Sequence, residues 1–283
     1  MKLNEYENKA LADILEWEKS THKGVHKKVL DITSKPVEYV IEKIGREKFE
    51  KFEKVVETTV RHLLTASKYT VNSKDILKRA HDHGIMIKSL KDIQKCDLSL
   101  LDKCNRENIK FHERAGAIQG AITGLAGGFL AAFDLASMLI QAFHLVQEIC
   151  YCYSYKPNSR IEREIILRIL EGALGSSEMK WKAIKEIKIL EKIKNKNKII
   201  VSRKGTSILG SKAMEGTIED ITVALIAQFM RRAIPIISVA LSSHSNHEIM
   251  EHSGNTAFMI YRKRFLERKK TQIRTCCNEK QKK

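Results

Sequence analysis

Apolar residues recur at intervals of three and four along most of the chain, which is the period of one face of an α-helix. The segment 49–64 follows this period throughout, with Phe49, Phe52, Val55, Val56, Val60, Leu63 and Leu64. A second segment, 161–170, shows the same period after Pro157. Because only three prolines occur in 283 residues, long stretches contain no helix breaker. We therefore predict an all-α fold.

Composition changes in the middle of the chain. Residues 115–133 carry no charge, and a second apolar block follows Asp134 and runs to Val146. We predict that these blocks form a glycine-rich helical hairpin buried in a single multi-helix domain, 1–268, with a basic, flexible C-terminal tail, 269–283. As a helix, the uncharged block would rise about 28 Å, close to the roughly 30 Å of a bilayer core. Insertion of the hairpin in a membrane is therefore the alternative to burial in the protein.

The first block holds five of the fourteen glycines: Gly116, Gly120, Gly124, Gly127 and Gly128. Their spacing does not match a phosphate-binding loop, but on a helix they share an arc of roughly 120°. Each glycine costs a helix about 1 kcal/mol relative to alanine, and close approach of another helix is the usual compensation. We predict that this face packs against a helix of this domain or of a membrane partner. Asp134 either continues the face or caps a new helix.

The chain is strongly basic, with a formal net charge of +17 from 51 Lys and Arg against 34 Asp and Glu. Such a charge attracts polyanions, either nucleic acid or the anionic face of a membrane. Aromatic residues make up 6% of the chain and are not interleaved with the basic segments. Because stacking platforms for single-stranded nucleic acid are then poor, an anionic membrane surface is the favoured partner and nucleic acid the less favoured one.

Two basic segments are the candidates for this contact. In 180–204 an apolar residue recurs every three positions from Trp181 to Ile193, as in basic helices that lie on membranes; alternatively, this stripe docks on the protein's own core. The second segment follows Tyr261, and Cys276 and Cys277 within it either carry reversible palmitoylation or stay unmodified. The candidate contact residues are Lys182, Lys185, Lys188, Lys192, Lys194, Arg262, Arg264 and Arg268.

Nothing in the sequence indicates a cofactor, a catalytic residue or a small-molecule substrate. His244, His247 and His252 are metal-ligand types, but Glu251 stands where the zinc-protease pattern HExxH requires its second histidine. We predict a solvated polar face and no metal site, with these three histidines as the candidate ligands if one exists. Residues 205–212 approach a Walker A loop with its last two positions reversed, which favours a plain loop.

The six cysteines form no CxxC pair, and the charged N-terminus shows no secretory signal. Reduced thiols in the cytoplasm are therefore expected. We predict a cytoplasmic protein associated with a membrane, either peripherally or through one inserted hairpin.

Several short motifs occur together in this chain. They are the block from Ala115 to Gly128, Asp134-Leu135, Gln147-Glu148-Ile149, Tyr153-Ser154-Tyr155, Glu16-Trp17-Glu18, Glu162-Arg163, Ile234-Pro235, Asn246 and the segment from Ala257 to Arg262. The combination resembles the EcsC protein family over roughly residues 10–268. Ser154 and Ser238 depart from it, because the family often has glycine at these two places.

The resemblance implies a helical protein and carries over no catalytic residue. The family's namesake is encoded beside an ABC transporter linked to secretion, so the resemblance also implies a connection to transport or secretion machinery. We expect a membrane-associated accessory or interaction protein without catalysis of its own, with a membrane transporter or another protein as a further partner. The alternatives are a basic helical nucleic-acid-binding protein and a hydrolase or metal enzyme that uses the region 244–252.

Overall fold

The computed structural model describes residues 2–24, 41–42, 45–65, 71, 73–82, 84–87, 89, 92–125, 131–196, 216–217, 220–225 and 238–280, and every regular element in these ranges is helical. The elements are α1 (Glu5–Gly24), α3 (Arg46–Thr65), α4 (Ser73–Asp82), the 3-10 helix η3 (Asp92–Lys95), α5 (Leu98–Leu125), α6 (Ala131–Cys152), α7 (Arg160–Leu174), α8 (Ser177–Lys196) and α10 (Ser238–Lys280). The predicted all-α fold is confirmed.

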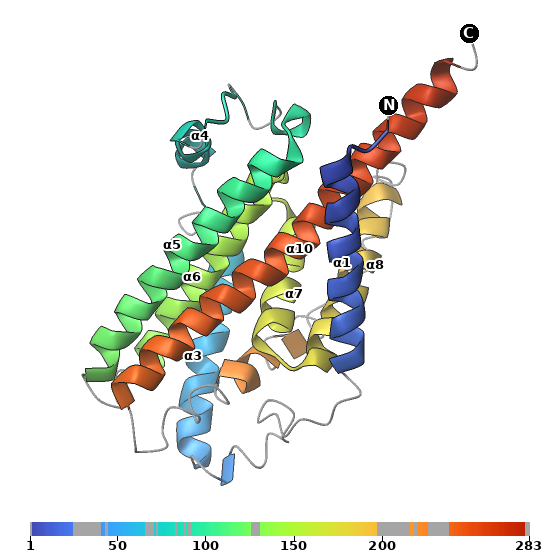
Figure 1. Ribbon diagram of the computed structural model, residues 1–283. Helices are drawn as coiled ribbons and strands as arrows, with labels where there is room; N and C mark the ends of the chain where they lie inside the picture. The colour runs from blue at the N-terminus through green and yellow to red at the C-terminus, as the bar shows by residue number, and fades with distance from the viewer. Residues whose placement is uncertain are drawn as a thin grey trace.

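The long helix α10 organises the bundle. It packs along α5 and also contacts α6, α7 and α1. Figure 1 shows it crossing the molecule diagonally, with α5 on one side and α1 and α8 on the other. The described helices therefore share one core, and charged side chains on α10 have several helices within reach.

Helix α6 supplies much of that core. Its residues from Met138 to Val146 include side chains with essentially no exposure, among them Leu139, Phe143 and Leu145. Helices α3, α5, α7 and α10 all contact α6. The apolar block after Asp134 is thus buried by the protein's own helices over this stretch.

The helices flanking this core are amphipathic, as their sequence period predicts. In α3 the buried side chains are Phe49, Val56, Val60 and Leu63, and α3 packs on α6. Helix α7 starts where Ser159 accepts a hydrogen bond from the Glu162 backbone N–H, and it ends where the Gly175 N–H donates to the Glu171 carbonyl. Such caps satisfy backbone groups that the helix itself cannot pair.

The apolar stripe of α8 docks on the protein itself. Ile184, Ile187 and Leu190 are buried, and α8 packs against α7 and α1. Of the two possibilities for residues 181–193, the described side chains therefore follow the one in which the stripe joins the protein's own core.

The predicted glycine-rich hairpin falls on α5 and α6, which contact each other. Gly127 and Gly128 lie outside the described residues, as do the surroundings of Gly120, Gly124 and Asp134. The glycine face thus stays a prediction at those positions. In the part of the chain that the structure describes, no helix has both the length and the apolar character needed to cross a membrane.

Residues 269–280, expected to belong to a tail, continue α10 as a helix. In Figure 1 this end of α10 projects beyond the bundle near the N-terminus. Lys269 forms an ion pair with Glu7 of α1. The side chains of Cys276 and Cys277 lie outside the described residues.

Candidate functional site

A close helix contact joins α5 to α10 through glycines on both sides. A Cβ atom added to Gly116 would lie 3.0 Å from Met250 Cγ and 3.1 Å from the Asn246 backbone oxygen. A Cβ atom on Gly254 would lie 2.8 Å from Ile109 Cγ1. Such distances leave no room for a side chain. At Gly116, the partner of the predicted glycine face is therefore a helix of the same domain.

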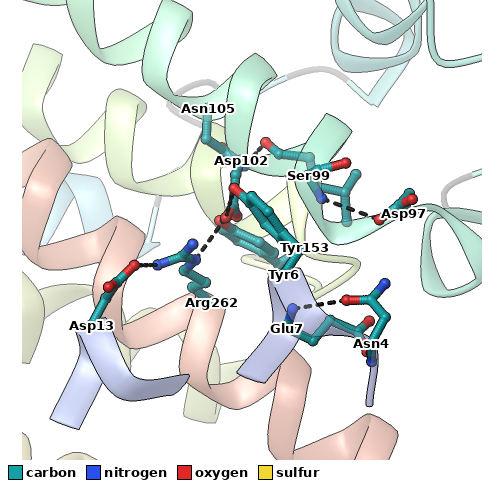
Figure 2. Close-up of polar contacts among 11 residues, drawn as sticks. Asn4, Tyr6, Glu7, Asp13, Asp97, Ser99, Asp102, Asn105, Tyr153 and Arg262 are labelled. Carbon is teal, nitrogen blue, oxygen red and sulfur yellow. Dashed lines mark hydrogen bonds and ion pairs between the residues drawn. The ribbon is translucent and has the colours of Figure 1, made fainter. Parts of the chain in front are cut away.

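A buried polar network surrounds Asp102 of α5 (Figure 2). Its Oδ2 accepts hydrogen bonds from the Tyr6 hydroxyl at 2.8 Å and from Arg262 Nε at 2.7 Å, and its Oδ1 accepts one from the Tyr153 hydroxyl at 2.8 Å. Asp13 of α1 lies 3.3 Å from the other side of the Arg262 guanidinium. Four parts of the chain, α1, α5, the end of α6 and α10, are joined at this carboxylate.

The environment of Asp102 suits a structural role better than acid–base chemistry. Burial raises the pKa of Asp102, and the Arg262 guanidinium and the Tyr153 and Tyr6 hydroxyls pull this pKa back down. Both carboxylate oxygens accept hydrogen bonds from donors of the protein, and Asp102 is only 1% exposed, so a substrate has no open access to it. The network holds the helices in register.

A second buried pair lies two residues further along α10. Arg264 forms an ion pair with Glu162 of α7, and its Nε donates to Glu191 of α8 at 2.5 Å. Its guanidinium lies over the rings of Tyr155, at 4.1 Å, and Tyr261, at 5.0 Å. A planar cation held between aromatic faces and carboxylates is well stabilised away from water.

Arg268 extends this arrangement to the turn after α6. Its two Nη atoms donate to the carbonyls of Tyr153, at 2.7 Å, and Ser154, at 3.1 Å, and its guanidinium lies 4.5 Å from the Tyr155 ring. Ser154 has φ 62°, a conformation that favours glycine. The departure of this chain from the Tyr-Gly pattern thus falls on a residue in a left-handed conformation.

Two of the predicted surface contacts need correction. The side chains of Arg262 and Arg264 are each only 3% exposed, so the prediction that they contact an anionic surface is wrong. The charge of each arginine is tolerated in the interior because it pairs with a buried carboxylate, that of Asp102 or Glu162. Arg268 is half-buried and engaged with backbone carbonyls.

The lysines of α8 differ among themselves. Lys182 binds Asp220 at 2.8 Å and Glu171 at 3.3 Å, and Lys188 lies 3.3 Å from Glu18. The other two candidate lysines whose side chains are described, Lys185 and Lys192, are exposed. The side chain of Lys194 lies outside the described residues.

Glu171 of α7 was not singled out by its sequence. Its side chain is buried, and Arg168 lies 2.7 Å away and Lys182 3.3 Å away. Burial raises the pKa of Glu171 to about 7, although Arg168 and Lys182 lower it in part. In the sequence, Glu171 is visible only as a carboxylate close to the apolar stripe of α7. The fold is needed to show that Arg168 and Lys182 surround it.

Other polar residues of the motifs also tie helices together. The Gln147 side-chain oxygen accepts a hydrogen bond from the Val71 backbone N–H at 3.0 Å. Glu148 Oε2 accepts one from Asn108 at 2.8 Å and lies 2.9 Å from His112 Nε2. These buried groups are satisfied by neighbouring elements of the chain.

The histidines near 244–252 form no metal-binding group in the described residues. No set of three or more His, Cys, Asp or Glu side chains there is placed to hold an ion. His247 is half-buried, His252 is exposed, and the side chain of His244 lies outside the described residues.

A small pocket opens between α1, α8 and α10. Its walls include Trp17, Lys188, Glu191, Met259 and Lys263, and its volume is about 20 Å³. That is room for about one water molecule, so the pocket in this form does not enclose a metabolite.

Comparison with known proteins identifies the family of this chain. The model of the EcsC protein family matches residues 8–266. The chain belongs to the EcsC protein family. A relative of this chain, "Uncharacterized protein YdbA" of Bacillus subtilis (strain 168), is 23% identical over 238 residues, which cover 82% of this chain and 81% of that protein. No solved structure matches the chain significantly.

Proposed function

We propose that this EcsC family protein binds the anionic surface of a membrane peripherally and acts there as an accessory or interaction protein, without catalysis of its own. The observation that carries the proposal is an uneven burial of charge. In the described part of the chain, five carboxylates are buried, against two guanidinium groups. Among the described residues, the exposed side chains therefore carry a larger excess of cations over carboxylates than these residues do as a whole, and the formal net charge of the full chain is +17.

Further support comes from the kind of polar sites the fold contains. The carboxylates of Asp102 and Glu162 are occupied by internal donors, and the pocket between α1, α8 and α10 holds only about 20 Å³. These features favour binding through the outer surface over chemistry inside a cavity. The EcsC namesake, encoded beside an ABC transporter, supports membrane transport machinery as the second partner.

Flotation with vesicles tests the proposal. The purified full chain is mixed with phosphatidylcholine vesicles, with or without phosphatidylserine, over a series of salt concentrations. We expect flotation with the anionic vesicles at low salt and its loss as salt screens the charges. Absence of flotation with either vesicle at low salt would falsify the proposal.

Nucleic acid is the competitor to be measured in parallel. A gel shift with DNA and RNA duplexes at the same salt concentrations compares the two polyanions directly, because phosphate contacts give a steep salt dependence. Tight nucleic-acid binding by a chain that does not float with vesicles would replace the membrane proposal with the alternative function.

A further inference from the structure

One face of α5 is left uncovered by the rest of the described bundle. The inner side of α5 carries Asp102, Ile109 and Gly116, which pack on α10 and its neighbours. On the opposite side, Phe111 and Ile118 are 62% and 64% exposed. Side chains of this size are normally covered in a helix that packs on all sides.

Of the seven exposed residues on the described part of α5, six form a continuous stripe. At 100° a residue these six fall within an arc of about 100°, over a length of about 27 Å. The seventh, Arg106, lies about 40° outside the arc, with its guanidinium 4.8 Å from the centre of the Phe258 ring. The stripe, called here the α5 outer face, consists of Leu100, Lys103, Lys110, Phe111, Arg114 and Ile118, all of which are exposed.

The charge of this face is complementary to an anionic surface. Lys103, Lys110 and Arg114 lie in the same arc as the exposed apolar side chains, and the half-buried Glu107 is the acidic residue among them. Glu113 falls outside the arc; burial raises the pKa of Glu113, and the neighbouring His247 of α10 lowers it in part. Three cations and three large apolar side chains therefore share one exposed stripe.

This combination fits a lipid bilayer better than other polyanions. An interfacial helix places Phe, Leu or Ile among the upper acyl chains while Lys and Arg stay with the headgroups. Nucleic acid would bind the cations but would gain little from the aliphatic Ile118. A second copy of the chain would bring like charges together.

We infer that the α5 outer face is the surface that docks on the membrane, with Phe111 and Ile118 inserted at the interface and Lys103, Lys110 and Arg114 against anionic headgroups. This inference rests on the proposed function, since it names the face that performs it. Figure 1 shows α5 and α8 at opposite edges of the bundle, so a flat bilayer meets one of them at a time.

Helix α8 provides a matched control on that other edge. It presents Lys185, Lys192 and Ile189, the last 50% exposed. Lys182 and Lys188 on the same helix are already paired with carboxylates. Equal charge changes on α5 and α8 therefore separate a specific docking face from a general effect of net charge.

The test compares vesicle flotation of four variants of the full chain with that of the unaltered protein. The pairs are Lys110→Gln with Arg114→Gln, Phe111→Ser with Ile118→Ser, and the control pair Lys185→Gln with Lys192→Gln; the single change Phe111→Trp keeps an interfacial aromatic. All changed positions are exposed, and circular dichroism with thermal melting checks that each variant folds.

We expect the Lys110/Arg114 variant to lose about 25-fold in partitioning onto phosphatidylserine vesicles, because each basic residue near an anionic leaflet contributes about fivefold. The Phe111/Ile118 variant should lose about tenfold or more. The control pair on α8 should change partitioning less than about twofold, and Phe111→Trp should bind at least as well as the unaltered chain.

The outcomes distinguish the inference from the function on which it rests. If the unaltered chain does not float, both fail. If it floats and the α8 pair weakens binding more than either α5 pair does, the membrane function stands and the α5 assignment is wrong. The assignment is also wrong if the Phe111/Ile118 variant floats normally, or if that variant turns a dimer into a monomer in sedimentation, since the face would then bind a second copy.

Discussion

The arginines of α10 and the lysines of α8 carry the same charge into opposite surroundings. Arg262 and Arg264 lie in the interior, whereas Lys185 and Lys192 lie in water. In sequence, both groups belong to basic segments of similar density. Local density of basic residues therefore does not tell which cations a partner can reach.

Position relative to the apolar stripe of the helix explains the difference. Arg262 lies four residues after Phe258 and three before Phe265, both buried, so it occupies the middle of the inward face. The exposed lysines of α8 lie off the stripe of Ile184 and Ile187, which are buried. The planar guanidinium also suits paired burial better than the strongly hydrated ammonium group.

The largest effect should come from breaking the buried pair. Asp102→Asn leaves the Arg262 charge in the interior, where its Nε now donates to Asp102 at 2.7 Å. We expect a loss of about 3–5 kcal/mol in the free energy of unfolding, measured by guanidinium denaturation at pH 7. Glu47→Gln, which breaks the exposed pair with Lys51, is the control and should change stability little. Equal effects of the two changes would contradict the structural role of Asp102.

A second prediction concerns Glu171 of α7, whose buried carboxylate forms an ion pair with the half-exposed Lys182 of α8. Since burial raises its pKa from 4.5 to about 7, the folded chain holds this proton more tightly than the unfolded chain does. Its contribution to stability is therefore fully present below pH 4.5 and is lost as the pH rises to about 7.

Glu171→Gln should remove this pH dependence. Relative to the unaltered chain, the variant should gain up to about 3 kcal/mol in the free energy of unfolding between pH 4.5 and pH 8. Denaturation at several pH values measures the difference, and Glu178→Gln in the first turn of α8, where the side chain is exposed, is the control. A difference that stays constant with pH would show that Glu171 titrates normally.

Much of the fold follows from the sequence because local periodicity carries it. The stripes of 49–64 and 161–170 became α3 and α7, and the part of the next stripe from Ile184 to Leu190 became the inner face of α8. Some signals of the buried network were also present. Asp102 lies between Leu98 and Ile109 on one apolar stripe, and a carboxylate there predicts a buried partner.

The partners themselves could not be predicted. Arg262 and Asp102 are 160 residues apart in sequence, and their meeting depends on how α5 and α10 pack. The glycine face indicated close packing at Gly116 but did not say which helix would approach it. The exposed side chains on the outside of α5 were also missed, because the period of α5 alone does not show which of its faces the other helices cover.

The smallest effect concerns Ser154. Its carbonyl and that of Tyr153 accept hydrogen bonds from Arg268, whose exposure lies between that of the buried arginines of α10 and that of the exposed lysines of α8. Ser154 holds φ 62°, a conformation in which a Cβ atom is unfavourable and glycine is not. Ser154→Gly should therefore raise the free energy of unfolding by about 1 kcal/mol, measured by denaturation. Ser154→Ala keeps the Cβ atom and should not stabilise. If alanine stabilises as much as glycine, the left-handed backbone conformation of Ser154 is not the cause.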